Sequence, residues 1–146
     1  MASVIFLNGA SSSGKTSIGK ALQDILEQPY LLLGLDTLFQ TVPARWAGGS
    51  LGPFRHLGFE YLDMPSEDGQ PVLGIGYGPV GWKILVGFHR AVAEIDAKNG
   101  NRVIIDEMLL DEEVRDHWLD VLTPFQPLLV GVYCDLAVLE QRESQR

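Results

Sequence analysis

The first apolar run of the chain, residues 4–7, leads into Gly9-Ala10-Ser11-Ser12-Ser13-Gly14-Lys15-Thr16, which fits the pattern G-x-x-x-x-G-K-[ST] at every fixed position. The two glycines allow backbone conformations that a side chain would forbid, so the amides of residues 11–16 can turn toward phosphate oxygens. The Lys15 ammonium can reach the β- and γ-phosphates of a nucleotide, and the Thr16 hydroxyl can ligate Mg²⁺. A chance glycine-serine turn is the other interpretation, and the strand before the loop and the helix after it disfavour that one.

The loop therefore predicts a nucleotide site. Its expected contacts come from consecutive residues: Gly9, Ala10, Ser11, Ser12, Ser13, Gly14, Lys15, Thr16 and Ser17. The serine hydroxyls of the loop can donate hydrogen bonds to the nucleotide, although a need for loop flexibility explains these serines equally well.

Composition limits the class of protein. The 146 residues suit one domain, 46% of them are hydrophobic, and 11 basic against 19 acidic side chains give a formal net charge of −8. Such a charge argues against non-specific binding to nucleic acid or to an anionic membrane, which needs basic patches. The one cysteine, Cys134, excludes an internal disulfide framework. Neither a signal peptide nor an apolar run of membrane-spanning length is visible, so we expect a cytoplasmic protein.

Strand-like and helix-like patterns alternate along the chain, which predicts an α/β fold with a parallel sheet and helices on both faces. We expect strands at 4–7, 30–35, 102–106 and 128–134, and helices from 15 to before Pro29 and at 36–42, 80–97, 112–122 and 137–146. The first of these helices shows Ile18, Leu22 and Ile25 at helical spacing, and the second is expected to be capped by Asp36. Residues 44–79 are interpreted as a substrate-side insertion whose segments 59–62 and 72–75 form a hairpin around a turn at 65–69.

Acidic residues stand where three of the expected strands end, and ligands of parallel sheets bind beyond that edge. Asp106 follows an apolar strand in the manner of a Walker B element and would hold Mg²⁺, with Glu107 sharing the task unless both are caps or solvated strand ends. Asp36 can accept a proton from a substrate hydroxyl or cap the next helix, and the spacing leaves both open. For Asp135, capping is favoured.

The remaining candidates carry weaker signals. The three histidines, His56, His89 and His117, lack the spacing of metal ligands, and His89 is expected to be structural. Cys134 is expected to be a small core residue. The aromatic residues in or beside the insertion form either a satellite core or an apolar pocket for an uncharged acceptor: Trp46, Phe54, Phe59, Tyr61, Tyr77 and Trp82.

Five segments together resemble the chloramphenicol phosphotransferase-like family of P-loop kinases. They are residues 5–9 leading into the serine-rich loop, Gly34-Leu35-Asp36-Thr37-Leu38, residues 103–107, residues 130–135, and Glu140-Gln141-Arg142-Glu143. The loop alone would place the chain only among P-loop proteins. The resemblance runs from the first strand to the last residue.

The resemblance implies a three-layer αβα P-loop fold with strand order 2-3-1-4-5 and ATP and Mg²⁺ as co-substrates. It implies transfer of the γ-phosphoryl group to an alcohol, with the antibiotic chloramphenicol as the family's known acceptor. The family's proposed base falls on Asp36, and its lid arginines fall near Arg142 and Arg146. The family continues past the lid with a further helix and a fifth strand, so we expect this chain to be an incomplete record with the order 2-3-1-4.

Three functions stay open at this point. The first is a kinase acting on a small alcohol, and the few basic residues of the insertion favour a neutral acceptor. The second is a kinase for another metabolite, such as a sugar, a nucleoside or a shikimate-like acid. The third is an ATP-binding module without transfer activity. The oligomeric state is left open.

Overall fold

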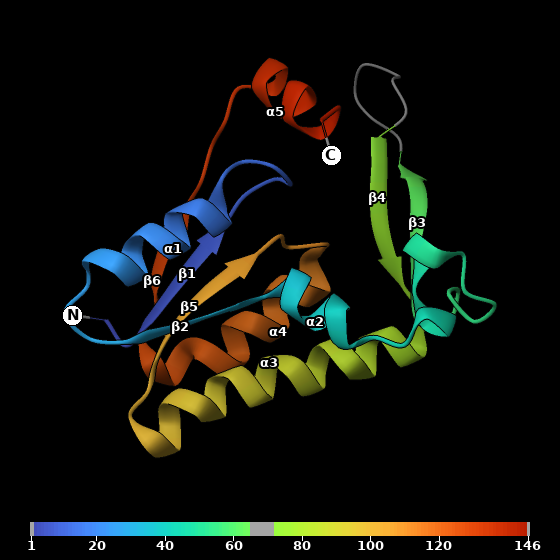
Figure 1. Cartoon of the computed structure of the whole chain (residues 1–146). Coiled ribbons are helices and arrows are strands. Elements are labelled where there is room, and N and C mark those ends of the chain that lie inside the picture. Colours follow the sequence, from blue (N-terminus) through green and yellow to red (C-terminus); the bar gives the residue numbers. More distant parts are fainter. Residues whose placement is uncertain (1, 65–71, 146) are drawn as a thin grey trace.

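A four-stranded parallel sheet forms the centre of the protein (Figure 1). The computed structural model describes residues 2–64 and 72–145. The strands are β1 (Val4–Asn8), β2 (Tyr30–Gly34), β5 (Arg102–Glu107) and β6 (Leu128–Gly131), and they lie in the order β2-β5-β1-β6. Counted without the inserted hairpin, this is the predicted order 2-3-1-4. The expected α/β fold with a parallel sheet is therefore confirmed.

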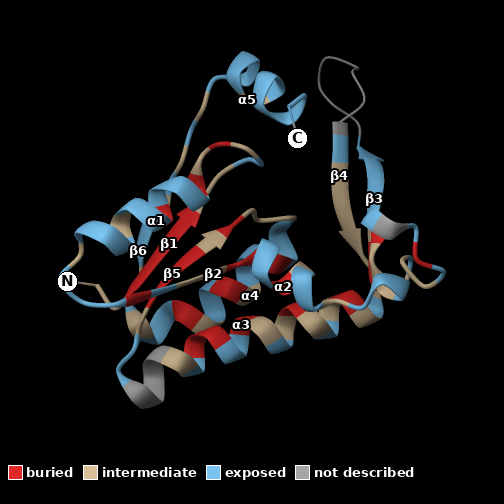
Figure 2. Cartoon of the chain, viewed as in Figure 1, coloured by how far each residue is buried: buried red, intermediate tan, exposed pale blue. Residues whose placement is uncertain are grey.

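Helices cover both faces of this sheet. Alternate strand residues point to opposite faces, so apolar side chains on each face need a covering helix. On one face, Ile5, Leu7 and Ile104 pack against α1 (Lys15–Ile25). On the other, Phe6, Val103 and their alternating neighbours pack against α3 (Pro79–Asn99) and α4 (Glu112–Leu122). Figure 2 shows the buried strands between helices whose outer surfaces are exposed. The result is the three-layer αβα arrangement.

The insertion forms its own small sheet beside this core. It follows α2 (Leu35–Thr41) through two short 3-10 turns, Ala44–Trp46 and Gly48–Ser50. Strands β3 (Phe59–Met64) and β4 (Val72–Tyr77) then pair antiparallel, as predicted. The turn expected at 65–69 lies outside the described residues. The chain returns to the core along α3, and Gly100, at a φ of 64°, directly follows the last residue of that helix.

The predicted first helix is confirmed, and the predicted capping of the second helix by Asp36 is wrong. The predicted apolar face of α1 is only partly buried, because Ile18 and Ile25 are exposed while Gly19 is buried against Leu32 of β2. A Cβ at position 19 would lie 2.7 Å from Leu32 Cδ1, so the close contact of α1 with the sheet requires the glycine. Helix α2 begins at Leu35 rather than after Asp36, its N-cap is Gly34, and the Asp36 side chain makes no capping hydrogen bond.

The C-terminal elements also differ in detail from the expectation. Strand β6 ends at Gly131, although the Val132 amide still donates to the Asn8 carbonyl at 2.7 Å. Cys134 lies beyond the strand and is partly exposed, so it is not a core residue. Helix α5 spans Leu136–Glu143, and Asp135 stands at its N-cap position without a side-chain capping bond. Across the described residues, no helix combines the length and the apolar character needed to cross a membrane.

Candidate active site

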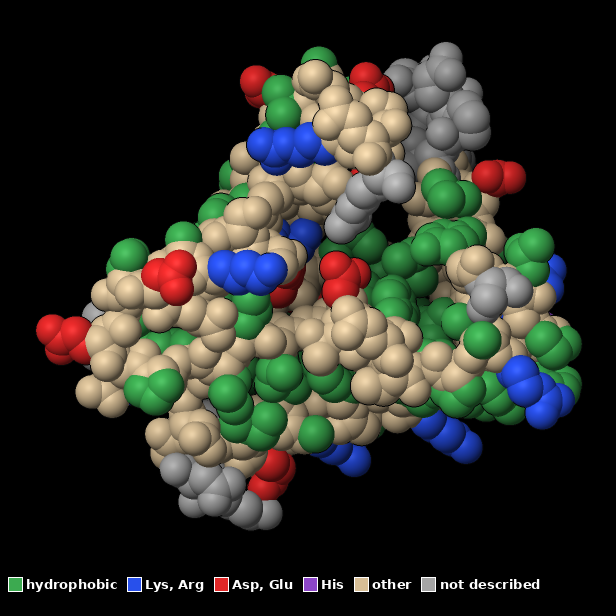
Figure 3. All heavy atoms as spheres, in the orientation of Figure 1, with side chains coloured by type: hydrophobic (Ala, Val, Ile, Leu, Met, Phe, Trp, Pro, Cys, Tyr) green, Lys and Arg blue, Asp and Glu red, His purple; other side chains and the backbone are tan. Residues whose placement is uncertain are grey.

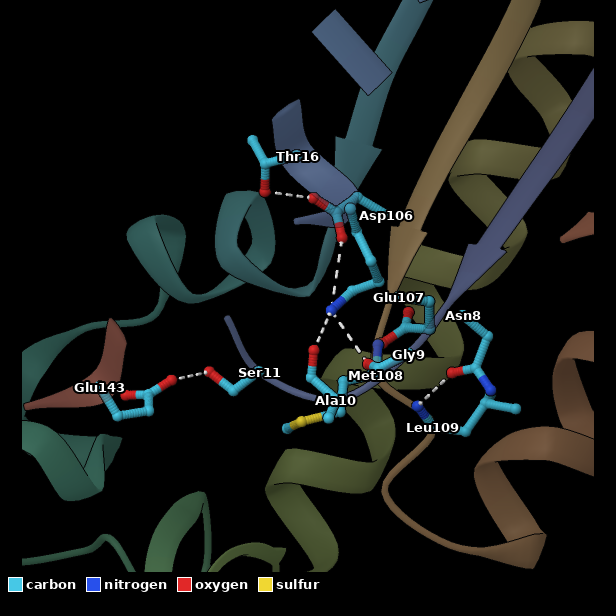
Figure 4. A network of polar contacts seen from close by, with 11 residues as sticks. Asn8, Gly9, Ala10, Ser11, Thr16, Asp106, Glu107, Met108, Leu109 and Glu143 are labelled. Atoms are coloured by element: carbon cyan, nitrogen blue, oxygen red, sulfur yellow. Dashed lines mark hydrogen bonds and ion pairs between the residues drawn. The ribbon is translucent and has the colours of Figure 1, made fainter. Parts of the chain in front are cut away.

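The predicted phosphate loop connects β1 to α1 at the carboxyl edge of the sheet. Its backbone turns through left-handed conformations at Ser12 (φ 57°) and Gly14 (φ 102°), and Lys15 is the first residue of the helix. The Lys15 side chain is buried, and its Nζ donates to the carbonyls of Gly9 at 2.9 Å and Ala10 at 2.8 Å (Figure 4). A buried ammonium held inside the loop is placed to meet an anion bound there.

The two predicted magnesium ligands, Thr16 and Asp106, lie side by side at the carboxyl edge of the sheet. Thr16 Oγ1 donates to Asp106 Oδ2 at 2.5 Å, and Lys15 Nζ lies 3.9 Å from Asp106 Oδ1 (Figure 4). Parallel pairing of β1 with β5 sets Leu7 opposite Asp106 and so places the acid beside the loop that follows β1. A hydroxyl and a carboxylate oxygen at this separation are the hard oxygen donors that Mg²⁺ takes.

Ser13 supplies a further polar group in the loop. The residue is 8% exposed, and its Oγ has no hydrogen-bond partner among the described residues. Buried hydroxyls are normally satisfied, so this one fits a loop whose acceptor is a bound ligand. The Ser13 amide does not turn inward as predicted for residues 11–16, because it donates to the Ala10 carbonyl at 3.3 Å. Ser17, on the first turn of α1, is exposed.

Asp36 lies at the same edge of the sheet, one strand away. Strand β2 pairs with β5 so that Gly34 stands opposite Asp106, and Asp36 follows two residues later in the first turn of α2. Strands β2 and β5 lie so close at Gly34 that a Cβ added there would lie 1.9 Å from the Asp106 carbonyl oxygen. The Asp36 side chain is exposed. The structure therefore sets the candidate base and the candidate magnesium ligand at neighbouring strand ends.

An apolar cavity of about 150 Å³ opens between α2 and the hairpin. Phe39, one turn after Asp36, contacts Phe59 edge to face with ring centroids 5.0 Å apart. The lining is completed by backbone and side chains of the insertion: Ala47, Gly48, Gly49, Glu60, Tyr61 and Ile75. Figure 3 shows hydrophobic side chains along the hairpin side of a hollow and acidic side chains near its centre.

The aromatic residues in or beside the insertion were expected to form either an acceptor pocket or a satellite core, and they occupy different places. Phe59 and Tyr61 line the cavity. Trp46 packs on Phe54, with ring centroids 5.0 Å apart, and both residues are partly exposed. Tyr77 stacks on Trp82 at 5.7 Å and donates to Asp111, the N-cap of α4, at 2.6 Å. Burial first, and then the hydrogen bond to Asp111, raises the pKa of Tyr77.

Glu107 does not share the expected metal role with Asp106, because successive strand residues point to opposite faces. Glu107 is 1% exposed, and its carboxyl group accepts hydrogen bonds from the Trp118 indole on α4 at 3.0 Å and from the Met108 amide at 3.0 Å. Burial raises the pKa of Glu107 to about 7, although these two donors pull in the other direction. The predicted structural role of His89 agrees with its place here: it is buried, stacked on Trp118 at 3.9 Å.

Helix α5 lies over the phosphate loop (Figure 1). Arg142 Nη1 donates to the Ser12 carbonyl at 2.9 Å and lies 3.8 Å from the Cys134 sulfur. This contact brings the first predicted lid arginine to the loop. Arg146, the second, lies outside the described residues.

Comparison with known proteins covers the residues that build this site. The model of the family described as "Chloramphenicol phosphotransferase-like protein" matches residues 2–146. The chain belongs to the chloramphenicol phosphotransferase-like family. Two relatives of this family member come from Mycobacterium tuberculosis: "Putative O-phosphotransferase MT2714" of strain CDC 1551 / Oshkosh and "Putative O-phosphotransferase Rv2636" of strain ATCC 25618 / H37Rv. Each is 29% identical to it over 148 residues.

The chain spans part of these relatives, since the alignments cover 98% of it and 62% of each of them. Among solved structures, "Crystal structure of APE1195" matches the family member with a TM-score of 0.56 at 19% identity, covering 97% of this chain and 66% of that one. At this level of identity, the match shows a shared fold.

Three features of the site escaped the sequence reasoning. Phe39 lines the cavity, and its spacing of three from Asp36 on a helix is the signal that would have found it. The Glu107–Trp118 pair follows from strand alternation, which places Glu107 on the opposite face of the sheet from Asp106. Glu143 contacts the loop through its carboxylate, and nothing in its local sequence distinguishes it from a solvated helix residue.

Proposed function

We propose that the protein is an ATP-dependent phosphotransferase that moves the γ-phosphoryl group to an alcohol hydroxyl of a small molecule. The observation that carries this proposal is the meeting of three groups at one sheet edge: the phosphate loop with Lys15, the Thr16–Asp106 pair, and Asp36, which lies one helical turn before the cavity-lining Phe39. Family membership supports the same class of reaction.

The phosphate loop would hold the nucleotide through residues 9–17. Lys15 is positioned to neutralise phosphate charge, and the partnerless Ser13 hydroxyl is available as a donor. Thr16 and Asp106 would hold Mg²⁺, and the ion supplies neutralisation of the phosphate charge when bound. Because phosphoryl transfer depends mainly on position and electrostatics, these residues act by fixing the nucleotide in place.

Asp36 is proposed as the base that acts on the acceptor. The acceptor oxygen forms a bond to the γ-phosphorus as the bond from that phosphorus to the bridging β,γ-oxygen breaks, and ADP leaves. The proton of the acceptor hydroxyl passes to the Asp36 carboxylate. The carboxylate is exposed at the sheet edge, which leaves it open to such a hydroxyl.

The insertion, residues 44–79, is proposed as the acceptor side of the site. The cavity wall is built from aromatic and aliphatic side chains and glycine backbone, with Glu60 as its one acidic member among the described residues. This lining favours a neutral, partly apolar acceptor of the chloramphenicol type over a sugar phosphate or another anion. Arg142 and Arg146 are proposed as lid residues that stabilise phosphoryl charge during transfer.

The proposal is tested by separating nucleotide binding from transfer. Asp36→Asn should leave the dissociation constant for ATP with Mg²⁺ unchanged and lower transfer to the acceptor about 10²–10⁴-fold, the size of a general-base contribution. Asp24→Asn, at an exposed position on α1, is the matched control and should leave both unchanged. Loss of ATP binding in the Asp36 variant would instead make Asp36 a structural or metal-site residue.

Two other functions predict different results. A kinase for another metabolite would keep the dependence on Asp36 but phosphorylate a sugar, nucleoside or shikimate-like acid in place of chloramphenicol. A module without transfer activity would bind ATP and phosphorylate no acceptor, and Asp36→Asn would then change nothing that can be measured.

A further inference from the structure

Helix α5 places a carboxylate on the phosphate loop. Oε1 of Glu143 accepts a hydrogen bond from Ser11 Oγ at 2.7 Å (Figure 4). The same oxygen accepts another from Ser12 Oγ at 2.6 Å. Both hydroxyls belong to the loop that the nucleotide phosphates would occupy. A carboxylate oxygen accepts the same hydrogen bonds as a phosphate oxygen and carries the same sign of charge.

The position of α5 does not come from burial in the core. No described residue of the helix is buried, and Figure 2 shows it as an exposed segment above the sheet. Glu143 and Arg142 hold the helix on the loop through polar contacts: the hydrogen bonds accepted by Glu143 and the bond from Arg142 Nη1 to the Ser12 carbonyl. A segment with few buried apolar contacts separates from the body of a protein at low free-energy cost.

Charge makes this contact unfavourable once a nucleotide is bound. The loop stands at the N-terminus of α1, whose dipole attracts one anion as readily as another. A phosphate bound at the loop would face the Glu143 carboxylate at short range, and two like charges about 4 Å apart repel enough to weaken binding by about 5-fold or more. Arg142, the neighbouring residue on the same helix, carries the opposite charge and has no such effect.

We propose that Glu143 is an internal competitor of the nucleotide phosphates, so that α5 with Glu143 on the loop holds the protein in an autoinhibited state. ATP binding displaces the carboxylate from Ser11 and Ser12. This inference rests on the proposed function, since it requires the loop to bind a nucleotide.

The test is a comparison of ATP affinities by isothermal titration calorimetry with wild type, Glu143→Gln and Glu140→Gln. The amide keeps the size of the side chain and removes its charge. Glu140→Gln makes the same change in charge on the same exposed helix, one turn away from the loop contact. We expect Glu143→Gln to bind ATP about 5–10-fold more tightly than wild type, with Glu140→Gln unchanged. Adenosine, which has no phosphate, should show no difference among the three proteins.

The alternative outcomes are distinct. Equal or weaker ATP binding by Glu143→Gln overturns the inference while leaving the proposed function intact. The same tightening in Glu140→Gln assigns the effect to net charge and also overturns it. If none of the three proteins binds ATP, the proposed function fails, and this inference fails with it.

Discussion

Replacing Glu107 by glutamine should remove a pH dependence of stability that the buried carboxyl group creates. In the folded protein, burial raises the pKa of Glu107 from 4.5 to about 7. Between these two pH values the folded state keeps a proton that the unfolded state releases, so the free energy of unfolding falls as pH rises. The stabilisation is fully present below pH 4.5 and is lost as the pH rises through about 7.

The size of the effect follows from the shift. At about 1.4 kcal/mol for each pH unit, a shift from 4.5 to about 7 corresponds to about 3 kcal/mol. Glutamine stays neutral at every pH and has one acceptor oxygen for the two donors, the Trp118 indole and the Met108 amide. The variant should therefore lose about 1–3 kcal/mol at low pH, where the wild-type carboxyl group is protonated, and show no further loss from this position as the pH rises.

A second buried group, His89, changes the stability of the wild type with pH in the opposite direction to Glu107. Burial, and then the nearby His117, lowers the pKa of His89 from 6.5 to about 3. This histidine contributes stability that is present above pH 6.5 and is lost as the pH falls toward 3. The two slopes have opposite signs between pH 4.5 and 6.5, so the wild-type profile should be nearly flat there with respect to these groups. Glu107→Gln should expose the histidine slope.

The assay is urea denaturation followed by tryptophan fluorescence, at half-unit steps from pH 4 to 8 and without added metal. The quantity to plot is the free energy of unfolding of the wild type minus that of Glu107→Gln. We expect this difference to fall by about 3 kcal/mol across the range. A difference that stays constant with pH would show that Glu107 has an ordinary pKa in the folded state and would refute the reasoning.

Three further predictions concern the loop and the residues around it. Lys15→Ala should abolish measurable ATP binding in calorimetry while the circular dichroism spectrum is unchanged, and ATP affinity equal to that of wild type would contradict the loop assignment. Gly34→Ala should destabilise the protein by more than 1 kcal/mol in urea denaturation, because its Cβ would meet the Asp106 carbonyl, whereas Gly87→Ala, with open space around it in α3, should be neutral or stabilising. Tyr77→Phe should lower stability by about 0.5–1.5 kcal/mol through the lost bond to Asp111 and leave ATP affinity unchanged, and a large loss of ATP affinity would contradict that separation.

The parts of the site that depend on local pattern were predictable from the sequence. The spacing of Gly9, Gly14 and Lys15 defines the loop wherever it stands, and the apolar run before Asp106 marks the end of a buried strand. Alternation of strands with helices predicted the parallel sheet, and the structure confirms it. The pairing of Thr16 with Asp106 then follows, because β1 and β5 are neighbours in that sheet.

The parts that depend on packing between distant segments were not predictable in the same way. Ile18 and Ile25 share the helical spacing of core residues, yet both are exposed, and α1 contacts Leu32 of the sheet through Gly19. The cap of α2 was misplaced because strand pairing at Gly34 decides where the helix begins. The contact of Glu143 with the loop joins residues more than 130 positions apart, which local sequence does not encode.

The central claim is tested most directly by mass spectrometry of the transfer reaction. The protein would be incubated with ATP, Mg²⁺ and, in separate reactions, chloramphenicol and a panel of neutral alcohols and metabolites. We expect an acceptor that gains one phosphoryl group as ATP becomes ADP, in the wild type and not in Lys15→Ala. No phosphorylated acceptor, with ATP bound normally, would contradict the proposed function.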